Sequence, residues 1–239
     1  MKVAISFFGT GSYLNFLPNW YESIENNLFP EIEKKIIVFT DGEGDFPENI
    51  VKVETEHFGW PEVFHKTFET ILRAKDIISE CDWFISIDAD MIVKKTITVE
   101  EFLDESKDYI GVHHPCAYLK LKPHDKFPGS FDVNPLSNAC ITEDMDTSVY
   151  YQGCLWGGKV PEIINMMELL DKWTKEDIKN NSVPVWYEES YFNKFFITNK
   201  DKVNTLSPSF AYPEDYKEYC DFEEKITHIS KNNQQYHNQ

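Results

Sequence analysis

The most informative segment of the chain runs Trp83-Phe84-Ile85-Ser86-Ile87-Asp88-Ala89-Asp90-Met91-Ile92-Val93. Its apolar residues predict a strand buried on both faces, as in parallel α/β sheets. Carboxylates at i and i+2 of an extended chain point the same way, so Asp88 and Asp90 can hold a hard divalent cation. Paired acids more often lie in a surface turn, but turns rarely have apolar residues on both sides. At the carboxyl end of a strand, the pair lies where open α/β sheets bind ligands.

The sequence before this segment alternates strands and helices. Continuous apolar runs predict buried strands at residues 2–8 and 35–40, and residues 50–55 are a third candidate strand. Residues 13–29 and 61–79 have the length and spacing of crossover helices. This order predicts an α/β fold with a Rossmann-like, mostly parallel sheet flanked by helices.

The second half is less regular. We expect strands at 108–113 and 149–156 and helices at 161–179 and 186–196. Residues 119–147 are rich in Pro, Asn and Asp and predict a long loop, either a binding segment or a surface excursion. With no repeat and no linker composition, we expect one domain over residues 1–239 that ends in a polar tail at about 228–239.

Composition narrows the function classes. The 239 residues include 23 Lys+Arg and 41 Asp+Glu, a formal charge of −18, which disfavours binding to nucleic acid or anionic membranes. The 5 cysteines are scattered without CxxC spacing, so they indicate neither a disulfide framework nor a zinc cluster. No apolar stretch reaches the roughly 20 residues of a transmembrane anchor, and no secretory signal is visible, so we expect a cytoplasmic protein.

Two aromatic segments could also carry chemistry. Residues 150–158 place Gly153, Gly157 and Gly158 among aromatics, which indicates either a bulge or close approach of a ligand or another backbone. Residues 186–196 surround Glu188 and Glu189 with aromatic side chains. Aromatic rings stack on sugars and carboxylates bind sugar hydroxyls, although exposed helix acids are equally common.

Together with residues 8–13 and 206–208, these segments resemble glycosyltransferase family 6, which includes the blood-group A and B transferases and the α-1,3-galactosyltransferases. The resemblance runs along nearly the whole chain. It implies a single domain with the GT-A fold that transfers galactose or N-acetylgalactosamine, with retention, from a UDP-sugar in α-1,3 linkage to a galactose-containing acceptor of the β-galactoside type. It also implies Mn²⁺ or a similar divalent cation.

The resemblance assigns roles residue by residue. It implies that Glu189 is the catalytic carboxylate and that Asp88 and Asp90 hold the metal. The donor UDP-Gal or UDP-GalNAc would be bound by Phe8, Thr10, Tyr13, Trp60, Asp88, Gln152, Gly153, Cys154, Glu188, Lys231 and His237. His114 and Trp186 fall where the family binds the acceptor. Because cysteine is larger than glycine or alanine, Cys154 favours UDP-Gal.

The chain departs from the animal members at several points. Thr67 and His237 stand where they have arginines near the donor. We also expect no membrane anchor, as in short microbial members. Many of those members replace the DxD motif by NxN and are similar to metal-independent enzymes, whereas this chain has both aspartates. The polar tail that contains Lys231 is a candidate lid over the donor.

Two other functions are consistent with the same residues. One is a non-catalytic module that binds UDP-sugars or glycans, and the other is a nucleotidyltransferase. The second usually needs a basic phosphate loop, and residues 8–13 contain no Lys or Arg. Glu189 together with the aspartate pair favours the transferase over the binding module, because a module without turnover needs neither.

Overall fold

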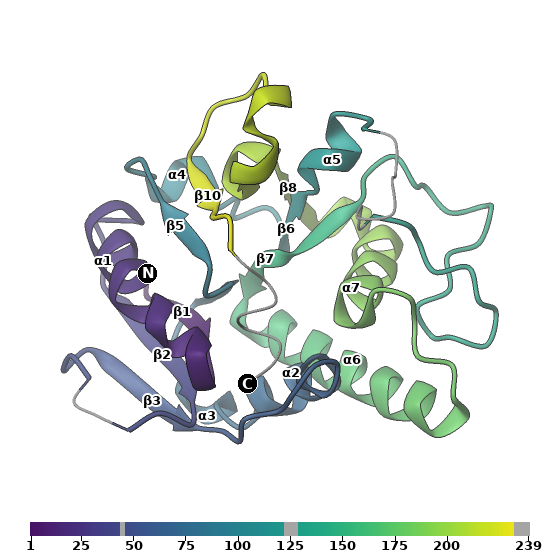
Figure 1. The fold of residues 1–239 in the computed structure, drawn as a ribbon, viewed down its shortest axis with the longest axis horizontal. Helices are drawn as coiled ribbons and strands as arrows, with labels where there is room; N and C mark the ends of the chain where they lie inside the picture. The colour runs from purple at the N-terminus through teal and green to yellow at the C-terminus, as the bar shows by residue number, and fades with distance from the viewer. Residues whose placement is uncertain (44–45, 122–128, 232–239) are drawn as a thin grey trace.

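The computed structural model describes residues 1–43, 46–121 and 129–231, and its centre is a seven-stranded sheet with the order β3-β2-β1-β4-β7-β6-β8 (Figure 1). Its strands are β1 (Val3–Phe8), β2 (Lys34–Thr40), β3 (Ile50–Glu54), β4 (Trp83–Ile87), β6 (Tyr109–His113), β7 (Tyr151–Lys159) and β8 (Val203–Leu206). All neighbouring strands are parallel except that β7 runs antiparallel to β4 and β6. The prediction of a mixed, mostly parallel sheet in a single α/β domain is confirmed.

Both faces of the sheet are covered. One face packs on α1 (Leu17–Asn27) and α4 (Val99–Phe102), together with a second sheet formed by β5 (Met91–Val93), β10 (Ile226–His228) and β9 (Tyr212–Pro213). The other face packs on α2 (Glu62–Leu72), α3 (Lys75–Ile78), α6 (Val160–Asn180) and α7 (Tyr187–Thr198). The remaining helices are short: α5 (Pro115–Tyr118), η1 (Gly11–Phe16), η2 (Lys200–Lys202), η3 (Pro208–Ala211) and η4 (Glu214–Tyr219). No helix in the described part of the chain has the length and apolar character needed to cross a membrane.

Three predicted elements have different bounds in the structure. The strand predicted over 83–93 is wrong as one element, because the backbone turns at 88–90 and β5 pairs with β10 in the second sheet. The helix predicted over 61–79 divides into α2 and α3 at Arg73 and Ala74, whose N–H groups bond to carbonyls three residues earlier. The helix predicted over 13–29 likewise divides, into η1 and α1. Pro18 lies in the first turn of α1, where its missing N–H costs no hydrogen bond.

The paired glycines of β7 have a structural explanation. A Cβ on Gly157 would lie 2.4 Å from the carbonyl oxygen of Phe84, and one on Gly158 would lie 2.3 Å from that of Asp108. Neighbouring backbone, and not a ligand, therefore requires glycine at these positions.

The topology creates one crevice. From β1 the chain passes to β2 on one side, and later returns to place β4 on the other side of β1. Connections that diverge from adjacent parallel strands leave an opening at the carboxyl ends of those strands. Phe8 and Asp88 lie at this opening.

Candidate active site

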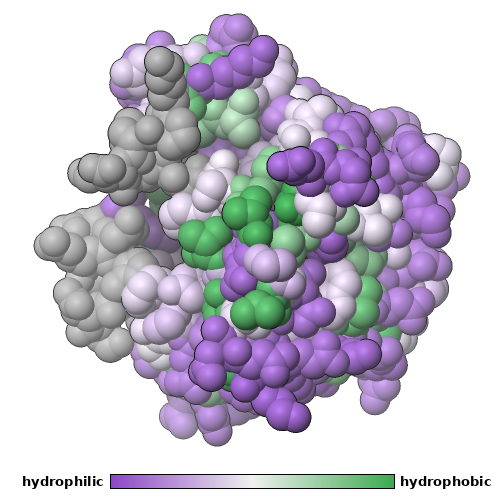
Figure 2. All heavy atoms as spheres, turned by 90° about the vertical axis from the view of Figure 1, so that its right-hand side faces the viewer, coloured by the Kyte–Doolittle hydropathy of each residue, from purple (hydrophilic) through white to green (hydrophobic). Residues whose placement is uncertain are grey.

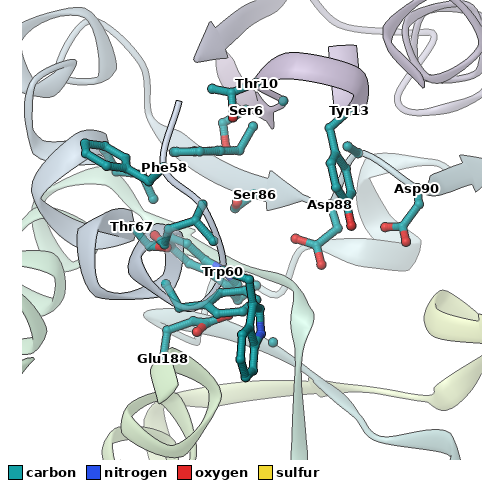
Figure 3. A pocket seen from close by; sticks show the side chains of 18 of the residues that line it. Ser6, Thr10, Tyr13, Phe58, Trp60, Thr67, Ser86, Asp88, Asp90 and Glu188 are labelled. Atoms are coloured by element: carbon teal, nitrogen blue, oxygen red, sulfur yellow. The ribbon is translucent and has the colours of Figure 1, made fainter. Parts of the chain in front are cut away.

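A cavity of about 260 Å³ lies at the carboxyl ends of β1 and β4. Figure 3 shows Asp88, Asp90 and Tyr13 at one end of it and Phe58, Thr67, Trp60 and Glu188 at the other. The predicted residues on its wall are Phe8, Thr10, Tyr13, Trp60, Thr67, Asp88, Asp90, Gly153, Glu188 and Lys231. The structure therefore brings most of the predicted donor and metal residues, which are far apart in the sequence, to one cavity.

The segment after β1 forms one wall and is supported by neighbouring loops. Asp41 accepts a hydrogen bond from the N–H of Gly11 at 2.9 Å, and Gly11 has a φ of +53°. The hydroxyl of Thr10 lies 2.9 Å from Nδ1 of His57. Sequence reasoning missed His57 and Phe58, which also line the cavity, although Trp60 in the same loop was a signal.

Asp88 and Asp90 have different surroundings. Asp88 is open to the cavity, while Asp90 is only 2% exposed and accepts hydrogen bonds from Nε2 of His228, at 3.0 Å, and from Nζ of Lys231. Burial acts to raise the pKa of Asp90, but the charges and hydrogen bonds of His228 and Lys231 hold it well below its usual range. The pKa of Asp88 is raised, by desolvation and by the adjacent Asp90.

His228 and Lys231 come to this site from the end of the chain. The Lys231 amine also lies over the Tyr13 ring, 4.8 Å from its centroid. Burial lowers the pKa of His228, but the Asp90 and Asp88 carboxylates outweigh it and raise the pKa. Sequence reasoning missed His228, because nothing local relates it to an aspartate 138 residues away.

The residues of the site supply only part of the coordination of a divalent cation, and a bound ligand must supply the rest. Carboxylate oxygens suit Mg²⁺ or Mn²⁺, and Asp88 accepts no side-chain hydrogen bond from the described residues. Among those residues, no group of three or more His, Cys, Asp or Glu side chains is arranged to hold an ion. Two carboxylates plus phosphate oxygens are a common way to bind such an ion, so Asp88 and Asp90 fit a metal that arrives with a diphosphate.

Two acids begin α7. Glu189 accepts hydrogen bonds from the hydroxyl of Tyr150 to Oε1, at 2.7 Å, and from the N–H of Gly153 to Oε2, at 2.8 Å. A Cβ on Gly153 would lie 3.4 Å from that of Glu189, an ordinary van der Waals contact, so Gly153 and Glu189 are direct neighbours. Burial raises the pKa of Glu189, while its two hydrogen bonds act to lower it. Glu189 is thus held in one orientation behind Gly153, which lines the cavity.

Glu188 faces the cavity itself. Its Oε2 is buried and has no hydrogen-bond partner among the described residues. Burial raises the pKa of this carboxyl well above its usual range. An unpartnered buried oxygen in a cavity wall is suited to a hydroxyl group supplied by a ligand.

Of the two predicted acceptor residues, His114 lies beside Tyr150, with 5.7 Å between the ring centroids. His114 caps α5, is 3% exposed, and accepts the N–H of Cys116 at Nδ1, at 3.1 Å, while its Nε2 has no partner in the described chain. Burial lowers the pKa of His114 to about 4, so the ring is neutral near pH 7 and this network assigns its proton to Nε2. Trp186 precedes α7 and donates from Nε1 to Oγ of Ser130 at 3.0 Å.

The other predicted donor residues lie elsewhere. Gln152 contacts Nδ1 of His228 through its amide nitrogen, at 3.5 Å, and its Oε1 is buried without a partner in the described part of the chain. Cys154 packs in the hydrophobic core and is not on the cavity wall, and its carbonyl accepts the N–H of Asp88. His237 falls outside the described residues.

A crevice at the switch point of an α/β sheet, headed by a DxD pair and flanked by two half-buried glutamates, is the layout of a glycosyltransferase with the GT-A fold. The sequence profile of glycosyltransferase family 6 matches residues 1–238, and the chain belongs to this family.

Named relatives agree with this assignment. The chain is 29% identical over 224 residues to the O-antigen biosynthesis glycosyltransferase WbnI of Escherichia coli, covering 92% of each protein. It is 24% identical to the dog Globoside alpha-1,3-N-acetylgalactosaminyltransferase 1, covering 89% of this chain and 61% of that protein. It is also 24% identical to the rat Histo-blood group ABO system transferase 2, covering 97% of this chain and 70% of that protein.

Proposed function

We propose that this glycosyltransferase moves galactose or N-acetylgalactosamine from a UDP-sugar, with retention, in α-1,3 linkage to a β-galactoside-type acceptor, at a metal-dependent site in the cytoplasm. The name of the dog relative supports N-acetylgalactosamine and the α-1,3 linkage, and the cavity supports a nucleotide donor. The observation that carries the proposal is the position of Glu189. Two hydrogen bonds hold its carboxylate beside the cavity, and Asp88 and Asp90 lie at one end of that cavity.

Glu189 is the proposed catalytic carboxylate. Retention needs a negative group that stabilises or traps an oxocarbenium-like centre on the face opposite the departing diphosphate, as in retaining glycosidases. The hydroxyl of Tyr150 and the N–H of Gly153 favour the ionised form of Glu189 and prevent its rotation. Glu188 accepts hydrogen bonds from sugar hydroxyls in the cavity, because its Oε2 has no partner among the described residues.

The diphosphate binds at the end of the cavity that contains Asp88 and Asp90. Asp88 and Asp90 would hold the divalent cation, which when bound supplies positive charge to the departing UDP. Lys231 is paired with Asp90 in this structure and lies over Tyr13, close enough to contact a diphosphate there. We propose that it transfers its contact from Asp90 to the donor phosphates. The rest of the predicted lid, residues 232–239, lies outside the described residues.

The acceptor approaches from the side of His114 and Trp186. The Nε2–H of His114 is buried and without a partner in the described chain, so it can donate to a sugar oxygen. The Trp186 indole supplies an aromatic face for the sugar ring.

The decisive experiment is incubation with UDP-Gal and UDP-GalNAc, Mn²⁺ and a panel of galactosides, with measurement of UDP release, product mass and the anomeric configuration of the product. Glu189→Gln keeps the size of the side chain and removes its charge, and we expect kcat to fall at least ~100-fold with donor affinity little changed. Donor binding without turnover by the unmodified protein would indicate the non-catalytic module instead. An inverted product would contradict the role of Glu189.

A further inference from the structure

A buried carboxylate outside the cavity plays no part in the chemistry described so far. Asp177 in α6 is 0% exposed, and no cationic side chain among the described residues forms an ion pair with it. Four donors surround it: Oγ of Ser137 at 2.8 Å, N–H of Asn138 at 2.9 Å, Nδ2 of Asn138 at 2.7 Å and Oη of Tyr191 at 3.0 Å. A buried charge is costly unless it is fully hydrogen-bonded, so Asp177 holds these groups firmly in place.

Three of the four donors belong to residues 129–141, which we call segment 129–141. This segment contains no helix or strand and lies on the face of the molecule seen in Figure 2, where apolar residues gather inside a hydrophilic rim. Side-chain hydrogen bonds hold this segment in position, since it forms no strand pairing. Asp132 accepts the N–H of Val185 at 2.9 Å, and Lys194 donates to the carbonyl of Cys140 at 2.7 Å.

The start of segment 129–141 contacts the acceptor side of the site. The hydroxyl of Ser130 accepts the indole N–H of Trp186, and the Phe131 ring lies 5.0 Å from the ring of Tyr150. The Tyr150 ring also lies 5.7 Å from the ring of His114. Of the two residues that we propose bind the acceptor, Trp186 therefore contacts this segment directly, and His114 is separated from it by the Tyr150 ring.

We propose that Asp177 is a positioning residue for acceptor binding: it fixes segment 129–141, which in turn fixes Trp186 and the outer face of Tyr150. This inference rests on the proposed transferase function. The catalytic side does not depend on the segment in the same way, because Tyr150 also accepts the N–H of His114 at its carbonyl, at 2.8 Å, and Glu189 is bound by Gly153. Loss of Asp177 should thus weaken acceptor binding and spare donor chemistry.

The test compares transfer to a galactoside with hydrolysis of the UDP-sugar in the absence of acceptor. Asp177→Asn places an amide NH₂ among groups that are themselves donors, so at least one hydrogen bond is lost. We expect the acceptor KM to rise at least ~10-fold, while donor KM and the hydrolysis rate stay within about threefold. Asp171→Asn is the matched control, because it makes the same change in the same helix at a carboxylate that pairs with Lys175 at 2.8 Å.

A second variant covers the case in which Asp177→Asn does not fold. Ser130→Ala removes the partner of the Trp186 indole at an exposed position, and we expect about a threefold rise in acceptor KM with unchanged thermal stability. Ser106→Ala, in a surface turn where its hydroxyl bonds to Asp104, is the control.

Two results would overturn the positioning role: equal losses of transfer and hydrolysis in folded Asp177→Asn, or an unchanged acceptor KM in folded Asp177→Asn. If that variant is unfolded, an unchanged acceptor KM in Ser130→Ala overturns it. Failure of the unmodified protein to turn over any UDP-sugar would instead contradict the proposed function.

Discussion

Tyr150→Phe is the most direct test of how the site controls its catalytic carboxylate. The substitution deletes the hydroxyl that donates to Oε1 of Glu189 at 2.7 Å and keeps the ring, which packs against His114 and Phe131. The N–H of Gly153 remains as the other donor to Glu189. One interaction of one reacting group is therefore removed.

The size of the effect follows from that hydrogen bond. A hydrogen bond to a charged group contributes about 1.5–3 kcal/mol. If the bond is lost from the ionised form, the pKa of Glu189 rises further, in addition to the rise already caused by burial. If the bond is also made in the transition state, kcat falls about 10- to 100-fold.

The pH dependence of kcat should change in a defined direction in Tyr150→Phe. Catalysis requires ionised Glu189, so activity is lost as pH falls through the pKa of this group. Because the hydroxyl of Tyr150 lowers that pKa, its removal shifts the acid limb of the kcat profile to higher pH. The loss should be larger at pH 6 than at pH 8.

The assay is UDP release at saturating donor and acceptor across this pH range. Tyr151→Phe is the control, since it deletes the neighbouring hydroxyl, which lies 2.9 Å from Oγ of Thr205 and does not contact Glu189. A Tyr150→Phe enzyme with the original kcat and an unshifted acid limb would refute the assignment of Glu189.

Three further predictions concern the donor. Asp88→Asn and Asp90→Asn should each lower activity by orders of magnitude and weaken Mn²⁺ binding in the presence of UDP, measured by calorimetry; full transfer in excess EDTA would contradict this. Glu188→Gln should raise donor KM more than it lowers kcat, because its free oxygen faces the cavity; kinetics in which only kcat changes would argue against this role. The family resemblance predicts that Cys154→Gly raises the ratio of kcat/KM for UDP-GalNAc over UDP-Gal by about tenfold, whereas the place of the thiol in the core and off the cavity wall predicts an unchanged ratio and lower thermal stability; an unchanged ratio in a folded variant would count against Cys154 as a selectivity residue.

Local pattern was enough to predict the parallel core and one end of the site. Strands β1, β2 and β4 are continuous apolar runs, and such runs fit only a sheet that is covered on both faces. The acids after β4 could then be placed at its carboxyl end, where ligands bind. These inferences needed only the sequence of each segment, because burial and periodicity are encoded residue by residue.

The tertiary structure decided which distant residues meet. Nothing near Asp90 in the sequence indicates that His228 and Lys231 reach it, and the break after β4 depends on pairing between β5 and β10, far apart in the chain. The contacts of Tyr150 with Glu189, and of Asp177 with segment 129–141, likewise join elements that come together only in the folded sheet. A sequence pattern specifies the face that a residue buries, but the partner on that face is set by strand order and register, which are properties of the whole chain.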